Sequence, residues 1–269
     1  MVKKINDWYE NKFKQYPAVT LIITIGVIVV SIGTFLTNIR EIHGLFSDVY
    51  QDIFLGKYHN EYDLIKGLNV GISSNYIVAK LGTPLFETEF FRDEKGAIYY
   101  EMAYSAKPYF LHFVLNEDKS VVLYTVIARK EDFHPIIPLP GGKEYKLGVS
   151  RLADLSDSPK HIAIDYSSKF WYYTETNYFG NLGFYRYYLF GLTPLGTDYS
   201  KNESDNYPYF PSEEEIEKGL TKSEIIEKKR KRYIPNAFCI TSEFIDVDLL
   251  DYVQNYYLGF DYFYARTLD

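Results

Sequence analysis

The chain has 269 residues, a formal net charge of −7, 18% aromatic residues and a single cysteine. One cysteine excludes an internal disulfide framework. The first 40 residues carry +3, so the remaining residues carry −10, which argues against nucleic-acid binding as the main function.

The only long apolar segment covers residues 18–36, nineteen residues without a charge. About 20 apolar helical residues cross the hydrocarbon core of a bilayer, so we predict a transmembrane helix at 17–38 that inserts in a lipid bilayer. The alternative is a cleaved signal peptide. Ser31-Ile32-Gly33-Thr34 matches an A-x-A-like cleavage site poorly, which favours an uncleaved anchor.

The charges that flank the predicted helix indicate its orientation. Arg40 is the only basic residue between the helix and Lys57, whereas the N-terminal flank 1–16 carries Lys3, Lys4, Lys12 and Lys14. The positive-inside rule predicts a cytoplasmic flank and an exported C-terminal domain at a bacterial inner membrane. Gly26 and Gly33 are small residues of the kind that lets transmembrane helices associate, so a homo-oligomer is one expectation.

Residues 39–62 have apolar residues at helical spacing and are predicted to form a helical stalk. Next comes a predicted α+β unit at 63–134. Ser73 or Ser74 begins a helix that ends at Leu81, since Gly82 and Pro84 follow. Strand-like runs separated by turn residues predict an antiparallel meander at 85–91, 97–106, 109–115 and 121–129.

Two resemblances rest on short motifs. Leu68-Asn69-Val70-Gly71-Ile72-Ser73 and Leu81-Gly82-Thr83-Pro84, followed by the meander, resemble BamE/SmpA-type lipoprotein domains over residues 64–130. The resemblance implies a non-enzymatic accessory or scaffolding domain at a bacterial envelope, although this chain has no cysteine that could carry the lipid. The whole layout, with 173–185 and Pro235-Asn236-Ala237-Phe238, resembles an uncharacterised bacterial family of single-span proteins and implies no known activity.

Turn-forming residues at 135–142 suggest a boundary before a second aromatic-rich α+β unit at 143–269. Strand-like runs recur at 161–165, 170–175 and 183–190. Leu147-Gly148-Val149-Ser150 and Ser158-Pro159 echo Val70-Gly71-Ile72-Ser73 and Thr83-Pro84, which suggests either a diverged duplication or a chance match.

A charged helical insertion is predicted at 212–232, because Ser212 with Glu215 and Thr221 with Glu224 both fit a capping box. The insertion ends in five consecutive basic residues, 228–232. These residues could attract anionic lipid or nucleic acid. We favour a solvent-exposed face whose cations complement a helix C-terminus.

No catalytic motif is present. The five histidines lack metal-ligand spacing, and no phosphate-binding or nucleophile motif occurs, so we expect no catalytic residue, metal or cofactor. His112 alternates within a predicted strand and is expected to be at the surface or half-buried. Cys239 is expected to be a small buried hydrophobe.

These observations predict an α+β fold: one N-terminal transmembrane helix, then an antiparallel-sheet-rich region with few short helices. The predicted function is that of a membrane-anchored, non-enzymatic interaction or scaffolding protein at the bacterial cell envelope, with an unidentified protein partner. The candidate interaction loops are Gly82-Thr83-Pro84 and the loop that contains Phe179, Gly180, Asn181 and Phe184. The alternatives are a membrane-anchored effector or sensor with a cytoplasmic domain, for example in phage defence, and a hydrolase with an unrecognised site.

Overall fold

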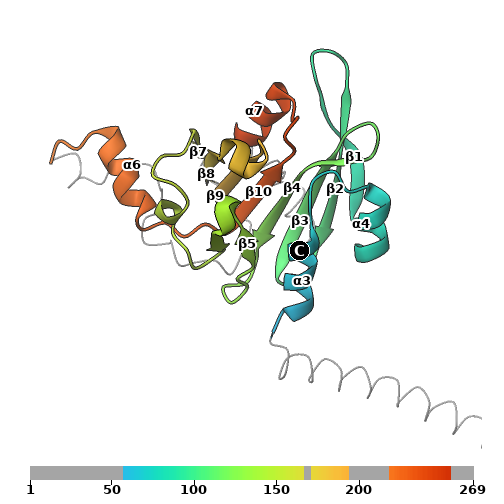
Figure 1. Ribbon diagram of the computed structural model, residues 1–269, viewed down its shortest axis with the longest axis horizontal. Coiled ribbons are helices and arrows are strands. Elements are labelled where there is room, and N and C mark those ends of the chain that lie inside the picture. Colours follow the sequence, from blue (N-terminus) through green and yellow to red (C-terminus); the bar gives the residue numbers. More distant parts are fainter. Residues whose placement is uncertain (1–56, 167–170, 194–217, 256–269) are drawn as a thin grey trace, which may run out of the picture. The chain divides into compact units, whose positions relative to one another are not determined.

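The computed structural model describes residues 57–166, 171–193 and 218–255 (Figure 1). The predicted N-terminal flank, the transmembrane helix, the stalk up to residue 56 and the Ser212 capping box lie outside these residues. Within the described part of the chain, no helix is both long enough and apolar enough to cross a membrane. The chain from Asn60 onward forms one compact unit, which is described here by itself.

The main feature of this unit is an eight-stranded antiparallel sheet in the order β1-β2-β3-β4-β10-β9-β8-β7. Its strands are β1 (Phe86–Arg92), β2 (Ile98–Ser105), β3 (Tyr109–Leu115), β4 (Val121–Ala128), β7 (His161–Tyr166), β8 (Trp171–Tyr178), β9 (Tyr187–Leu192) and β10 (Ala237–Thr241). A separate two-stranded hairpin contains β5 (Ile136–Pro138) and β6 (Glu144–Lys146). The predicted antiparallel-sheet-rich fold with few short helices is confirmed for the described residues.

Short helices connect and cover the strands. They are α3 (His59–Gly67), α4 (Ser74–Leu81), α6 (Lys222–Arg230), α7 (Val247–Asn255) and the 3₁₀ turns η2 (Pro140–Gly142), η3 (Leu152–Asp154) and η4 (Gly180–Gly183). The predicted ends of α4 are confirmed, because the Ser73 side chain accepts from the Tyr76 N–H and the Gly82 N–H donates to the Val78 carbonyl. The Thr221–Glu224 capping box at the start of α6 is also confirmed.

Both faces of the sheet are covered. On one, here called the α7 face, Leu249 and Val253 of α7 pack against a cluster that includes Phe110 and Leu123. On the opposite face, here called the hairpin face, Tyr145 of β6 lies 4.8 Å from Phe190, measured between ring centroids. All seven residues of β3 are buried as a result.

The two halves of the sheet have matching strand orders. In each half a short helical segment, α4 or η3, precedes four antiparallel strands that pair in sequence order, although α6 lies between β9 and β10. The halves join through their last strands, β4 and β10, with Thr125 opposite Cys239. The Gly71 N–H donates to the carbonyl of Val121 at the start of β4, and the Gly148 N–H donates to that of Pro235, just before β10. Both glycines have positive φ, +83° and +73°. This match supports the duplication that the sequence echo suggested.

The boundary predicted at 135–142 falls on η2 and the β5–β6 hairpin. Strands from both predicted α+β units belong to the same sheet, because β4 of the first unit pairs with β10 of the second. The described parts of the two units therefore share a continuous core.

Candidate functional site

The described histidines lie on different elements. His59 is on α3, His112 on β3, His134 follows β4, and His161 begins β7. The described residues contain no group of three or more His, Cys, Asp or Glu side chains that could hold a metal ion. This scatter argues against a hydrolytic site built on these histidines.

The expectation for His112 was wrong. Its side chain is 1% exposed and its Nε2 lies 2.9 Å from the buried Glu101 carboxylate. His112 does lie in a strand, β3, as its alternating sequence predicted. Both faces of β3 are covered, however, and an alternating sequence gives no sign of a second covered face.

Cys239 is fully buried at the centre of the sheet, as predicted. Burial raises the pKa of its thiol to about 12, and a hydrogen bond with Thr125 acts in the opposite direction. The thiolate is the reactive form, so this cysteine is structural.

Because Cys239 is the only cysteine, its reactivity reports unfolding. We expect the folded full-length chain at pH 8 to react with a thiol reagent such as DTNB only at the rate at which the sheet opens, and the chain in denaturant to react within the mixing time. Rapid labelling of the folded chain would contradict the burial of this side chain.

The basic run at 228–232 does not form a uniformly solvated face, which corrects the sequence interpretation. Lys229 and Arg230 are buried. Arg230 Nε donates to Glu175 Oε1 on β8 at 2.7 Å, and its Nη atoms donate to the carbonyls of Leu152, Ser156 and Asp157. Arg230 therefore attaches α6 to the hairpin face. Lys231, the next residue, pairs with Glu227 at the surface.

The partner of Arg230 lies in an unusually polar buried strand segment. Thr174, Glu175, Thr176 and Asn177 of β8 are all buried. Burial raises the pKa of Glu175, while hydrogen bonds from Arg230 and Tyr173 lower it. Sequence reasoning did not find this pair, because the run Thr-Glu-Thr-Asn is typical of an exposed strand face.

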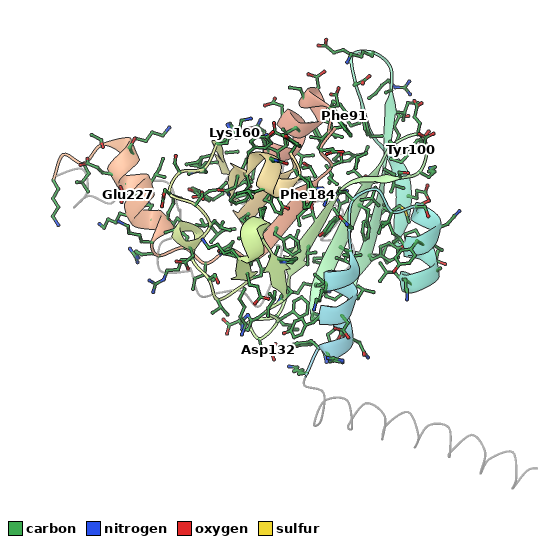
Figure 2. The ribbon with its side chains drawn as sticks, viewed as in Figure 1. Phe91, Tyr100, Asp132, Lys160, Phe184 and Glu227 are labelled. Atoms are coloured by element: carbon green, nitrogen blue, oxygen red, sulfur yellow. The ribbon has the colours of Figure 1, made fainter. Side chains whose placement is uncertain are left out.

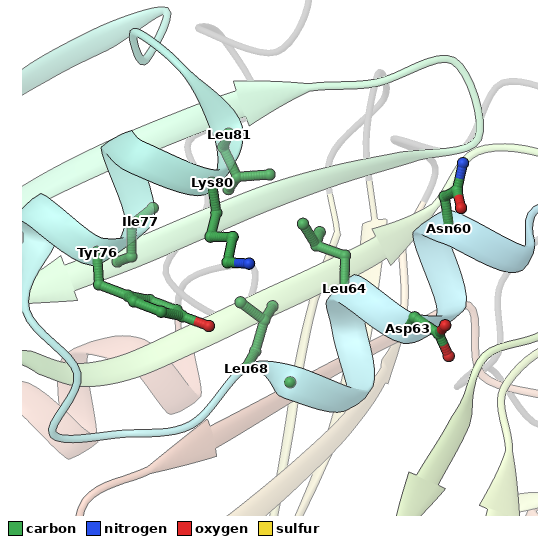
Figure 3. A pocket seen from close by; sticks show the side chains of 9 residues that line it. Asn60, Asp63, Leu64, Leu68, Tyr76, Ile77, Lys80 and Leu81 are labelled. Atoms are coloured by element: carbon green, nitrogen blue, oxygen red, sulfur yellow. The ribbon is translucent and has the colours of Figure 1, made fainter.

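A small groove lies between α3 and α4 (Figure 3). It has a volume of about 270 Å³ and apolar walls formed by Leu64, Leu68, Ile77 and Leu81, with Tyr76 and Lys80 on α4 directed across it. The candidate loop Gly82-Thr83-Pro84 begins directly after Leu81, and the Gly82 carbonyl accepts from the Tyr104 hydroxyl. This loop leads into β1, at the end of the sheet opposite the β8–β9 loop. The structure therefore does not bring the two candidate loops together.

The β8–β9 loop is the more distinctive candidate. Its side chains Leu182, Phe184 and Tyr185, here called the aromatic tip, are 73%, 67% and 50% exposed. Figure 2 labels Phe184. Phe184 and Tyr185 both adopt left-handed backbone conformations, with φ of 53° and 58°. Each such residue costs about 1–2 kcal/mol. The strand expected to begin at Gly183 therefore begins only at Tyr187.

Local contacts hold this loop in its strained conformation. The N–H groups of Phe184 and Tyr185 donate to the carbonyls of Asn181 and Gly180. The Phe179 ring packs on Tyr188 at 5.5 Å, and a Cβ added at Gly183 would lie 2.9 Å from Phe179 Cβ. The exposed rings are therefore presented on a fixed backbone, and strain of this kind is typical of functional loops.

The composition of the loop resembles that of protein interfaces. Residues 178–187 contain five aromatic residues, one arginine and no acidic residue. Arg186 lies 5.7 Å from the centroid of the Phe184 ring and donates to Asn69 Oδ1. Tyrosine, phenylalanine and arginine are enriched in interfaces, and Asp and Glu are depleted.

Comparisons with protein-family models, with curated proteins and with solved structures found no match to this chain.

Proposed function

We propose that this chain is a membrane-anchored, non-enzymatic interaction or scaffolding protein of the bacterial cell envelope. The predicted helix at 17–38 would hold the chain in the inner membrane, and the aromatic tip would bind a protein partner. The observation that carries the proposal is the exposure of three large side chains on a loop that contains two left-handed residues, Phe184 and Tyr185. The resemblance of residues 64–130 to BamE/SmpA-type domains supports the same class of function.

Helix α3 runs along the sheet between its two ends. Tyr62 near the start of α3 stacks on Phe133, just beyond the end of β4, whereas Asn69 beyond α3 contacts Arg186. Helix α3 therefore runs toward the end of the sheet where the tip lies. The start of α3 therefore lies at the end of the sheet opposite the tip.

The first test is the orientation of the chain in the membrane. Protease added to intact spheroplasts is expected to remove a C-terminal tag, because the positive-inside rule predicts that residues 41–269 lie outside. A tag that is digested only after lysis would contradict the envelope proposal. It would favour the cytoplasmic effector or sensor instead.

The second test uses a photo-crosslinking amino acid at Leu182 in the full chain in living cells. The control position is Glu94 in the β1–β2 turn, which is also exposed and lies at the same end of the sheet. We expect a protein adduct from position 182 and little from position 94. Equal yields at both positions would contradict a binding role for the tip.

Phe184→Asn separates binding from folding, because asparagine tolerates the left-handed conformation and carries no ring. We expect an unfolding free energy within about 1 kcal/mol of wild type, and a loss of most of the adduct formed from position 182. Gly183→Ala is the contrasting variant. Its new Cβ would meet Phe179, so it should alter the loop itself. An unchanged adduct with Phe184→Asn would exclude the ring from the interface.

A further inference from the structure

We propose that the partner of the aromatic tip is a second copy of this chain, which presents its β10–α7 loop to the tip. The inference rests on the proposed function, because it names the partner of the same surface. The observation behind it is that the β10–α7 loop is also apolar and exposed. This loop carries acidic residues, whereas the β8–β9 loop carries a basic one, and the two loops leave the sheet side by side.

The β10–α7 loop, here taken to include the first turn of α7, carries Phe244 and Val247, which are 87% and 76% exposed and exceed the tip residues in exposure. Two acidic residues, Glu243 and Asp248, flank these side chains and are exposed. Neither carboxylate has an ion-pair partner in the structure as described. This loop is therefore apolar and acidic, whereas the β8–β9 loop is aromatic and carries only the positive charge of Arg186.

The two loops begin side by side. Strand β9 starts where β10 ends, and the Tyr187 N–H donates to Thr241 Oγ1 at 3.1 Å. From there the loops diverge to opposite faces. The β8–β9 loop turns toward the hairpin face, where Gly183 lies against Pro140 and Phe179 lies against Tyr188. The β10–α7 loop leads to α7 on the other face.

This arrangement is complementary to a copy of itself. A two-fold axis that runs across the strands at this end of the sheet places two copies end to end and exchanges their faces. The acidic, apolar loop of one copy then lies opposite the basic, aromatic tip of the other, twice over, as an isologous interface requires. In each of the two symmetry-related contacts, opposite charges face each other and apolar side chains pack together.

The contact is small, because two loops per copy present fewer than the 20–30 residues of a standard interface. A membrane anchor compensates for a small contact, since it confines both copies to one surface and raises their effective concentration. The proposed dimer therefore forms in the membrane, in the full chain.

Disulfide trapping tests the contact directly. Two differently tagged full-length copies are co-expressed, one with Leu182→Cys and the other with Phe244→Cys, and their membranes are oxidised with copper phenanthroline. The buried Cys239 stays out of the reaction. We expect a mixed dimer at several times the yield of the matched control, Leu182→Cys with Glu94→Cys. A yield no higher than that control would overturn the proposal.

Charge reversal adds a second, independent arm. Arg186→Glu in the Leu182→Cys copy is expected to lower the mixed-dimer yield by about tenfold, and Glu243→Arg in the Phe244→Cys copy to restore it. Restoration shows that both chains fold and that the two loops meet. A mixed-dimer yield that neither charge reversal alters would overturn the proposal.

The photo-crosslinker at Leu182 distinguishes the failure of this inference from that of the proposed function. An adduct with the mass of two copies supports both. An adduct with a different protein supports the interaction role and overturns the self-association. No adduct above the Glu94 control contradicts both.

Discussion

Replacing Arg230 by alanine is expected to lower the free energy of unfolding by about 3–5 kcal/mol, because the change leaves the Glu175 carboxylate buried without its charge partner. Three backbone carbonyls, those of Leu152, Ser156 and Asp157, each lose the hydrogen bond that Arg230 donates. For a unit of this size the loss corresponds to a fall in Tm on the order of 10 °C.

The measurement is a denaturant titration of the full chain in detergent, with thiol labelling of Cys239 as the probe of the unfolded fraction. Lys231→Ala is the matched control, since Lys231 is the next residue of the same basic run and makes only a surface ion pair with Glu227. We expect its midpoint to stay close to that of wild type. Equal midpoints for Arg230→Ala and Lys231→Ala would contradict the buried attachment of α6.

A double variant distinguishes a lost ion pair from lost packing. Arg230→Met with Glu175→Leu removes both charges and keeps most of the side-chain volume, so it is expected to recover much of the stability lost by Arg230→Ala. A double variant as unstable as the single one would place the cost in the backbone carbonyls that Arg230 holds.

The first half of the fold could be predicted from sequence because its signals are local. Ser73 and Gly82 mark the ends of α4, and the turns between β1 and β4 contain Gly96, Pro108 and Asn116. The predicted β3 has the bounds of the observed strand, and the other three strands agree within a residue at each end.

The second half was harder, because tertiary contacts decide its structure. Thr174, Glu175, Thr176 and Asn177 have the composition of a solvent-exposed strand, yet α6 and the residues around η3 bury the Glu175 side chain. The left-handed residues Phe184 and Tyr185 delay β9, and aromatic residues give no local signal for that conformation. The pairing of β4 with β10, far apart in sequence, is a long-range contact that periodicity cannot show.

Only part of the candidate site could be anticipated. The loop that contains Phe179, Gly180, Asn181 and Phe184 was predicted from its sequence, and two glycines between aromatic runs are typical of such a loop, in which Gly180 has a φ of +58°. The second loop was missed, because Phe244 and Val247 lie within the aromatic-rich unit predicted at 143–269 and no turn motif marks them. The signal was present in sequence: the apolar residues alternate with Glu243, Asp246 and Asp248 directly after a buried strand.

The second large effect is expected at the other buried ionisable pair, Glu101 and His112. Replacing His112 by alanine removes the group 2.9 Å from the Glu101 carboxylate and opens space beside the Phe90 ring, so both an unsatisfied polar group and a cavity result. We expect a loss of about 3 kcal/mol, measured by the same labelling of Cys239.

His161→Ala is the matched control for this prediction, because His161 is exposed and lies at the start of the edge strand β7. Its removal is expected to leave the midpoint nearly unchanged. If His112→Ala were as mild as His161→Ala, Glu101 would have to reach water without its partner, and the α7 face would be open at β2 and β3. A large loss of unfolding free energy for His112→Ala but not for His161→Ala would mean that the Glu101–His112 pair stabilises the α7 face. The Glu175–Arg230 pair is expected to do the same on the hairpin face. The surfaces left for binding are then the loops at the ends of the sheet.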